Sequence, residues 1–102
     1  MMNHPAFRAG LRPDRAVLQV KGEDARHFLH NLVTADVEGL QSGQSRYAAL
    51  LTPQGKIRFD MFICDAGDRF LIDCAAAKSA ELLKLLGFYK LRAKVTVEPI
   101  DL

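Results

Sequence analysis

The sequence contains no tryptophan and only two cysteines. It also has no apolar run near the roughly 18 residues that a membrane-spanning helix needs. Cys64 and Cys74 have neither a CxxC spacing nor a neighbouring ligand, so we predict no tightly bound metal. The segment from Met1 to Pro5 lacks the apolar core of a secretory signal peptide. We therefore expect a cytosolic protein in which both thiols are reduced.

Neither sign of charge dominates, because 14 basic and 12 acidic residues give a formal net charge of +2. That imbalance is too small to indicate binding to nucleic acid or to an anionic membrane. With 102 residues, 49% of them hydrophobic, the chain is expected to form one globular domain. We expect a lead-in arm over residues 1–15, where no periodicity is present, and a folded domain over residues 16–100.

The segment from Arg46 to Cys74 is predicted to form three antiparallel strands joined by two tight turns. The turns are residues 52–55 (TPQG) and 65–68 (DAGD), since proline and glycine supply the backbone angles that tight turns need. Side chains alternate between the two faces of a strand. In the middle strand, the wholly apolar face holds Ile57, Phe59, Met61 and Ile63 and is predicted to be buried in the core. The other face holds Lys56, Arg58, Asp60, Phe62 and Cys64.

A symmetric second turn places Asp60 opposite Asp73 in the neighbouring strand. Two carboxylates at that distance resist ionising together and form one hypothesis for a catalytic pair. The alternative is a solvated face whose charges are balanced by Arg58, and we favour it because structural ion networks are common. In the same register Cys64 and Cys74 point to opposite faces, so we predict no disulfide between them.

Further strands and helices are predicted on both sides of this meander. The second helix consists of strong helix formers, and the first begins with acidic residues at the positive end of its dipole. The predicted elements are strands over 16–20 and 94–98, the latter ended by Pro99, and helices over 22–33 and 75–86, the latter weakened or ended by Gly87. The resulting order is β-α-β-β-β-α-β.

Two helices can cover only one face of a sheet of about five strands. We therefore predict an α+β, two-layer sandwich, a variant of the ferredoxin-like fold with a mostly antiparallel sheet and both helices on one face. On the bare face Phe62 is expected opposite Leu71, and exposed apolar side chains there favour a two-fold homodimer. The bare face is predicted to show Gln19, Lys21, Arg58, Asp60, Phe62, Leu71, Asp73, Thr96 and Glu98.

His27 and His30 lie three residues apart on one surface of the first predicted helix. Nothing supplies the further ligands that a metal site requires, so we predict exposed, unliganded histidines. The sequence also contains no standard signature of a hydrolase, a zinc protease, a P-loop or a dinucleotide-binding fold. No complete active site is expected from these residues alone.

Three segments carry recognisable motifs in order. Residues 20–36 (VKGEDARHFLHNLVTAD) contain G-x-D-A-x-x-F-L-x-x-L-x-T-x-D, and residues 50–57 (LLTPQGKI) contain L-L-x-P-x-G-[KR] ahead of Asp60. Residues 88–95 (FYKLRAKV) contain Y-x-L-R-x-K-V. Over roughly residues 13–100 the chain thereby resembles the YgfZ-type folate-binding proteins, relatives of the glycine-cleavage T-protein, an aminomethyltransferase.

This resemblance implies a role in iron–sulfur cluster assembly or repair assisted by tetrahydrofolate, with folate and iron–sulfur proteins as partners. In T-protein relatives a tyrosine on the strand before the second motif and an aspartate on the strand after it line the folate site. The matching positions here are Tyr47 and Asp60. Arg58 and Asp73 share a face with Asp60 and complete the predicted folate-binding set.

The chain departs from these relatives at two points. T-proteins have two successive aspartates where this chain has Phe59 and Asp60, which favours the YgfZ-type branch over aminomethyl transfer. The K-G-C-[FY]-x-G-Q-E motif of YgfZ-type proteins does not occur, so we expect a fragment equivalent to the N-terminal part of a longer protein and catalytically incomplete alone. The alternatives are a piece of an aminomethyltransferase-like enzyme and a non-catalytic dimerisation or docking domain.

Overall fold

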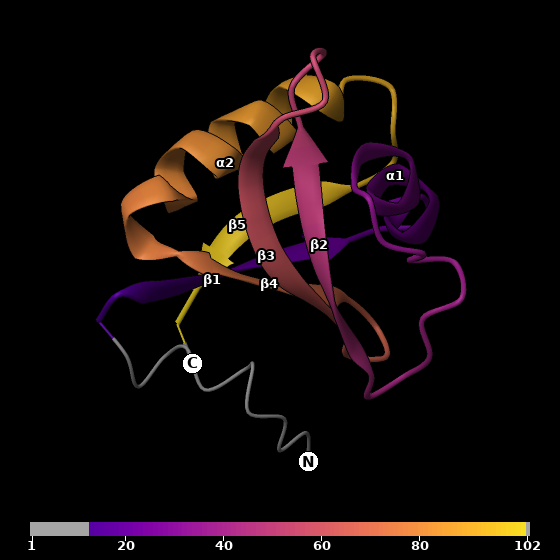
Figure 1. Cartoon of the computed structure of the whole chain (residues 1–102). Helices are drawn as coiled ribbons and strands as arrows, with labels where there is room; N and C mark the ends of the chain where they lie inside the picture. Colours follow the sequence, from indigo (N-terminus) through magenta and orange to yellow (C-terminus); the bar gives the residue numbers. More distant parts are fainter. Residues whose placement is uncertain (1–12, 102) are drawn as a thin grey trace.

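The computed structural model describes residues 13–101. The five strands form one antiparallel sheet in the order β2-β3-β4-β1-β5, which confirms the predicted α+β class and element order. Residues 1–12 of the expected lead-in arm lie outside the described residues, and its last residue, Arg15, begins the first strand. The elements are β1 (Arg15–Lys21), α1 (Ala25–Leu32), β2 (Ser45–Leu51), β3 (Ile57–Asp65), β4 (Phe70–Ala75), α2 (Ala76–Tyr89) and β5 (Thr96–Ile100) (Figure 1).

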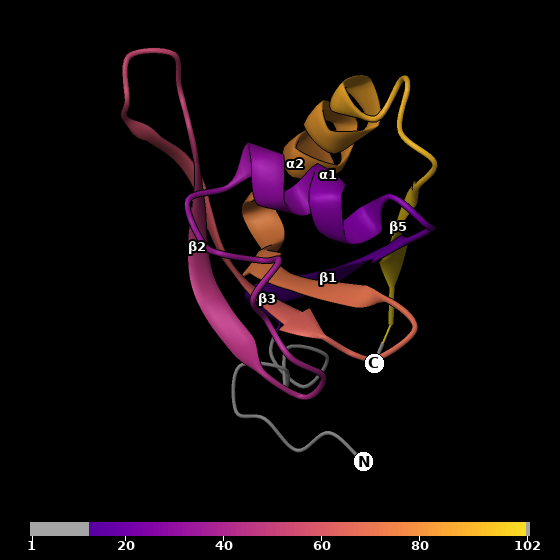
Figure 2. The ribbon, with the colours of Figure 1, turned by 90° about the vertical axis from the view of Figure 1, so that its right-hand side faces the viewer.

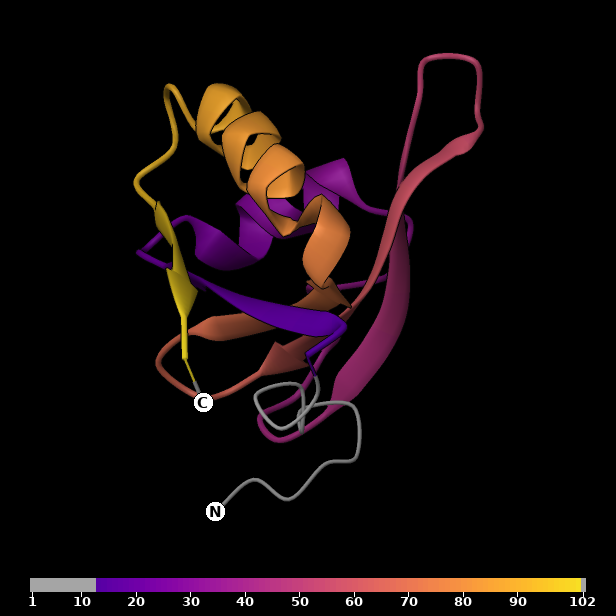
Figure 3. The ribbon, with the colours of Figure 1, turned by 90° about the vertical axis from the view of Figure 1, so that its left-hand side faces the viewer.

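Both helices pack on the same face of the sheet and form a two-layer sandwich with it (Figures 2 and 3). Strands β4 and β5 both pair antiparallel with β1, so the β4-α2-β5 crossover joins two parallel strands with β1 between them. This split β-α-β arrangement also occurs in ferredoxin-like folds. Each large side chain buried between the layers contributes about 1.5–3 kcal/mol. The most deeply buried include Leu18, Val20, Leu29, Met61, Ile63, Ile72, Leu82 and Leu86.

The middle strand, β3, follows the predicted alternation over most of its length. Phe59, Met61 and Ile63 are buried in the main core, as expected. The prediction for Ile57 is wrong, because this side chain is 61% exposed. The tip of the β2–β3 hairpin projects away from the rest of the sheet (Figures 2 and 3), and a register irregularity after Leu50 alters the pairing there. Ile57 therefore lies beyond the cover of the two helices.

The connection between α1 and β2 is rich in polar residues and glycine, yet it contributes two side chains to the core. Val37 and Leu40 are 1% and 3% exposed and belong to the main apolar cluster. Both are isolated apolar residues within a stretch of acidic, amide and glycine residues, so no periodic pattern marks them in the sequence. The loop is consequently part of the packed structure.

Two predicted boundaries are wrong for identifiable reasons. Helix α2 continues through Gly87 to Tyr89. A glycine inside a helix costs only about 1 kcal/mol relative to alanine, which the burial of Leu82 and Leu86 outweighs. Pro99 lies inside β5, which is an edge strand, and a proline at a sheet edge can leave the ladder intact.

The hairpin between β3 and β4 has a different register from the predicted one. Asp65 pairs with Phe70, and Gly67 takes a φ of +94° in the turn between them. Phe62 consequently lies opposite Asp73. A shift of two residues keeps every side chain on its face but changes its partner. The expected pairs of Asp60 with Asp73 and of Phe62 with Leu71 therefore do not form.

The sheet face away from the helices is less bare than predicted. Leu71 is 6% exposed and packs with Val17 and Cys64 in a second, smaller apolar cluster. Gln19 and Asp73 on this face are also buried. The apolar area available for the expected homodimer is therefore smaller than the alternation pattern indicated.

Two of the three family-like segments meet at the start of α1. Gly22 has a φ of +133°, and a Cβ atom at this position would collide with the carbonyl oxygen of Lys94. The carboxylate of Asp24 accepts a hydrogen bond from the backbone N–H of Lys94 at 2.8 Å, and the Asp24 N–H donates to the Lys94 carbonyl at 3.3 Å. The packing of Gly22 and Asp24 against the last motif thus explains the glycine and the first aspartate of the first motif.

We predict that Gly22→Ala lowers the free energy of unfolding by roughly 1–3 kcal/mol, because the positive φ and the collision with Lys94 both oppose a side chain. Gly87→Ala is the matched control, since its added Cβ meets open space inside a helix. It should stabilise the domain by up to about 1 kcal/mol. Urea unfolding of both variants is the measurement, and a Gly22→Ala variant as stable as the parent would contradict the prediction.

Candidate functional site

A hydrogen bond between two predicted site residues joins β2 to β3. The hydroxyl of Tyr47 donates to Oδ2 of Asp60 at 3.0 Å. The Tyr47 ring meets the ring of Phe62, its partner in the ladder, edge to face with the centroids 5.7 Å apart. All three side chains are exposed. The hydrogen bond to the carboxylate raises the pKa of Tyr47, and the negative charge of Asp60 adds to this shift.

A hollow of about 250 Å³ lies beside Asp60, between β3 and the start of α2. The ladder between β3 and β4 ends at the pair of Phe62 with Asp73, and the chain leaves β4 at Ala75 to begin α2. The first residues of β3 therefore have β2 on one side and the hollow on the other. The hollow is lined by Ile57, Arg58, Phe59, Asp60, Cys74, Ala75 and Lys78.

Two cations reach this hollow above the buried ring of Phe59. The guanidinium of Arg58 lies 5.6 Å from the ring centroid, and one of its nitrogens is 3.6 Å from the carboxylate of Glu81 on α2. The ammonium of Lys78 lies 5.7 Å from the same centroid. The structure thus brings Arg58 and Asp60 together at one hollow and adds Lys78. Sequence reasoning missed Lys78 because its position depends on where α2 meets the sheet.

Asp73 has a separate partner and does not join this arrangement. Its carboxylate accepts a hydrogen bond from Nε of Arg15 at 2.8 Å, and Nη2 of Arg15 donates to the Asp73 carbonyl at 3.2 Å. The Asp73 side chain is buried, so this ion pair joins β1 to β4 inside the structure. The hypothesis of a carboxylate pair between Asp60 and Asp73 is therefore wrong.

The two cysteines are poorly placed for nucleophilic chemistry. Cys74 belongs to the main core and Cys64 to the second apolar cluster, which confirms that they lie on opposite faces. Burial raises the pKa of each thiol to about 11, and the charge of Asp65 adds to the shift at Cys64. Since the thiolate is the reactive form of cysteine, neither side chain is activated at neutral pH.

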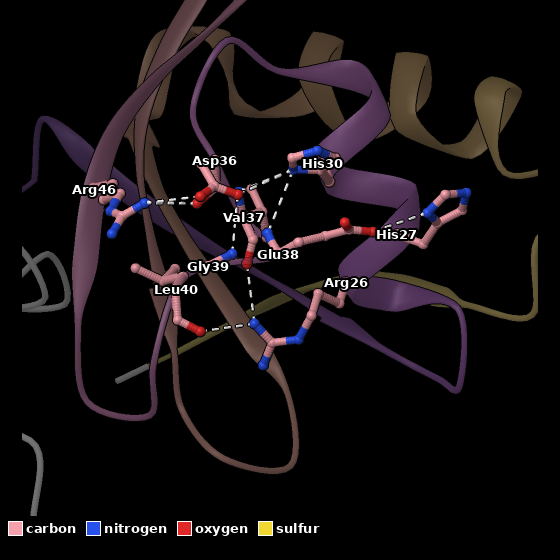
Figure 4. Close-up of polar contacts among 9 residues, drawn as sticks. All are labelled: Arg26, His27, His30, Asp36, Val37, Glu38, Gly39, Leu40 and Arg46. Carbon is pink, nitrogen blue, oxygen red and sulfur yellow. Dashed lines mark hydrogen bonds and ion pairs between the residues drawn. The ribbon is translucent and has the colours of Figure 1, made fainter.

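The two histidines belong to a polar cluster that fixes the loop after α1 (Figure 4). Nδ1 of His30 accepts hydrogen bonds from the backbone N–H groups of Val37 and Glu38 at 3.2 and 3.4 Å. Nδ1 of His27 lies 3.1 Å from the Glu38 carboxylate. His30 is therefore half-buried, which corrects the expectation that both rings are exposed. Within residues 13–101, no group of three or more potential metal ligands is close enough to hold an ion.

Arg26 completes this cluster from the same helix (Figure 4). Its Nη1 donates to the carbonyl oxygens of Val37 and Leu40 at 2.9 and 2.8 Å. Its Nη2 donates to the buried carboxylate of Asp65 at 2.6 Å. The arginine thereby ties α1, the following loop and the β3–β4 hairpin together. Its contacts are structural, and they leave the hollow beside Asp60 as the candidate site.

A second hollow, of about 400 Å³, lies between α1 and the C-terminal end of α2. Apolar side chains of Phe28 and Leu32 contribute to its lining, and two of its polar side chains, Asp24 and His27, already have hydrogen-bond partners within the chain. Neither of the residues that the motifs assign to folate lies in it. Its full lining is Asp24, His27, Phe28, Asn31, Leu32, Tyr89, Arg92 and Ala93.

Comparison with protein families matches residues 15–101 to the family described as the GCVT N-terminal domain. The chain belongs to this family. The match includes every strand and helix of the structure, and it confirms the predicted relationship to the glycine-cleavage T-protein.

Several proteins similar to this chain are iron–sulfur cluster assembly factors. The mitochondrial IBA57 homolog of Chaetomium globosum is 35% identical and covers 96% of this chain, and mitochondrial IBA57 of Mus musculus is 34% identical and covers 83%. The chain spans 26% and 28% of the lengths of these two proteins. Among solved structures, the glycine cleavage system aminomethyltransferase T from Bartonella henselae matches 85% of this chain with a TM-score of 0.79 and 25% identity. The chain covers 24% of that structure.

These comparisons correct the expected location. The iron–sulfur assembly factors that the chain resembles are named as mitochondrial, so the prediction of a cytosolic protein is wrong. The composition of the N-terminal segment indicated only that it is not a secretory signal peptide. That observation does not bear on import into an organelle. Within the part of the chain that the structure describes, no helix has the length and apolar character needed to cross a membrane.

We predict that the native chain resists alkylation by iodoacetamide at neutral pH, whereas the unfolded chain exposes two reactive thiols. The folded thiols have pKa values of about 11 against an ordinary value of 9.0. Burial of the two protonated thiols therefore contributes fully to the free energy of unfolding below pH 9, and this contribution is lost as the pH rises through 11. Mass spectrometry after timed labelling, with and without denaturant, tests this. Rapid native labelling of Cys64 or Cys74 at neutral pH would count against it.

We predict that His30→Ala lowers the free energy of unfolding by about 1–3 kcal/mol, because two backbone N–H groups lose their acceptor. Amide hydrogen exchange at Val37 and Glu38 should accelerate in the same variant. His30→Asn places an acceptor oxygen close to the position of Nδ1 and should restore part of the protection. Unchanged exchange at both amides in His30→Ala would show that the ring does not fix the loop.

Proposed function

We propose that this chain is the tetrahydrofolate-binding domain of a YgfZ-type protein that serves iron–sulfur cluster assembly. The observation that carries the proposal is the hydrogen bond from Tyr47 to Asp60 beside the hollow at the start of β3. The similarity to proteins named as iron–sulfur cluster assembly factors supports a role in iron–sulfur cluster assembly. The similarity to an aminomethyltransferase supports folate as the cofactor.

The chemistry of these side chains fits a reduced pterin ring. Such a ring presents several N–H groups, and the carboxylate of Asp60 has acceptor capacity beyond the single bond from Tyr47. The exposed rings of Tyr47 and Phe62 offer an aromatic surface against which the flat ring can pack. Tetrahydrofolate, when bound, would supply a carrier of one-carbon units at its ring nitrogens. In this arrangement Asp60 orients the pterin and Tyr47 holds the carboxylate in place.

The isolated domain is proposed to bind folate weakly. Its hollow of about 250 Å³ is below the range of about 300–1,000 Å³ that encloses most small ligands. Tyr47 and Asp60 are exposed, so they form one wall of a site and exclude little water by themselves. Since the chain spans about a quarter of its relatives' lengths, the activity and client proteins of those longer proteins are proposals for this one.

A domain of an aminomethyltransferase is the second candidate, favoured by the match to the Bartonella henselae enzyme. The first of the two successive aspartates found in T-proteins is replaced here by Phe59, which is 3% exposed in the main core. A carboxylate at that position would be buried among apolar side chains at high cost. Asp60 is then the carboxylate on the exposed side, which favours folate binding without aminomethyl transfer.

Calorimetry with tetrahydrofolate tests the proposed function. We predict measurable but weak binding by the 102-residue chain and a loss of about tenfold or more in Asp60→Asn, because hydrogen bonds to a charged acceptor contribute about 1.5–3 kcal/mol. Tyr47→Phe should weaken binding less, since the ring remains. Asp68→Asn removes an equal charge at an exposed turn and serves as the control. Absence of binding by the parent chain, or equal binding by Asp60→Asn, would refute the proposal.

A further inference from the structure

The hollow beside Asp60 carries more positive charge than the binding of a pterin ring requires. One carboxylate, Asp60, and two cations, Arg58 and Lys78, line it, with Arg58 on β3 and Lys78 on α2. Arg58 forms an ion pair with Glu81, in which Nη2 of the arginine lies 3.6 Å from the carboxylate. Among residues 13–101, no carboxylate lies within ion-pairing distance of Lys78. In the described structure, Lys78 thus contacts the ring of Phe59 but has no ion-pair partner.

The two cations also lie above the same aromatic ring. Their charged groups are 5.6 and 5.7 Å from the ring centroid of Phe59, and each contact is favourable on its own. Two like charges at one ring nevertheless repel each other. An anion bound near both cations would reduce that repulsion, and arginine and lysine are both common partners of carboxylates.

We infer that this hollow binds a small α-amino acid in its zwitterionic form. The carboxylate of the amino acid lies between Arg58 and Lys78, and its ammonium group donates to Asp60. The lining of the hollow includes two cations and one carboxylate, which are complementary in charge to the carboxylate and the ammonium group of the ligand. A volume of about 250 Å³ has room for roughly eight groups the size of a water molecule, enough for a small amino acid.

The inference goes beyond folate binding and does not depend on it. Oδ2 of Asp60 accepts the hydrogen bond from Tyr47, which leaves Oδ1 for the ammonium group. Because Asp60 belongs to both proposals, the test contains no folate. Failure of folate binding and failure of amino-acid binding are then separate results.

The experiment is a nuclear magnetic resonance titration of the isotope-labelled 102-residue chain with alanine. Saturable shifts are expected at the amides of residues 57–60 and 75–78. Propionate, which lacks the amino group, and ethylamine, which lacks the carboxylate, should each bind at least about tenfold more weakly. Lys78→Gln and Asp60→Asn should each weaken alanine binding by a similar factor. Both positions are exposed, and the dispersion of each variant's spectrum reports directly that it is folded.

Lys84→Gln is the matched control, because Lys84 is an exposed lysine on the same helix outside the hollow. Its affinity for alanine should equal that of the parent chain. The inference is overturned if alanine produces no saturable shifts at the hollow, or if propionate binds as tightly as alanine. It is also overturned if Lys84→Gln weakens binding as much as Lys78→Gln, since the effect would then come from net charge alone.

Discussion

The candidate site depends on the difference in length between two neighbouring strands. β3 has nine residues and β4 has six, because the chain leaves the sheet at Ala75 to begin α2. The start of β3 therefore borders a hollow where another strand would otherwise pair with it. The buried side chains of Leu82 and Leu86 hold α2 on the core and so keep this gap open. Arg58 and Asp60 line this hollow as a direct consequence.

The structure separates its structural charges from those available to a ligand. Asp65 and Asp73 are buried and bonded to Arg26 and Arg15, and breaking a buried ion pair by removing one partner is costly. Asp60 is exposed, and its bonded partner is the neutral hydroxyl of Tyr47. A ligand can therefore bind Asp60 without disrupting the fold. This contrast supports the proposal that Asp60 is the ligand-binding carboxylate of the β3–β4 hairpin.

Much of the fold could be predicted from local patterns, because alternation in a strand and periodicity in a helix each follow from burial on one side. The alternation in β3 placed Phe59 in the core and Asp60 on the exposed face even though the cross-strand register was off by two residues. Partners depend on turn geometry, and the sequence DAGD is compatible with more than one turn. Contacts between distant segments, such as that of Arg26 with Asp65, leave no local signal at all. The family resemblance predicted Tyr47 and Asp60 as site residues. Lys78 could not be predicted, because its position at the hollow depends on where α2 packs on the sheet.

The most direct test of the account is to map where tetrahydrofolate contacts the isotope-labelled chain by nuclear magnetic resonance. The account predicts that the largest shifts fall on β2 and β3 around Tyr47, Asp60 and Phe62, with little change between α1 and the end of α2. Shifts centred on the larger hollow beside Phe28 and Tyr89 would contradict it, because they would locate the ligand away from the carboxylate on which the account depends.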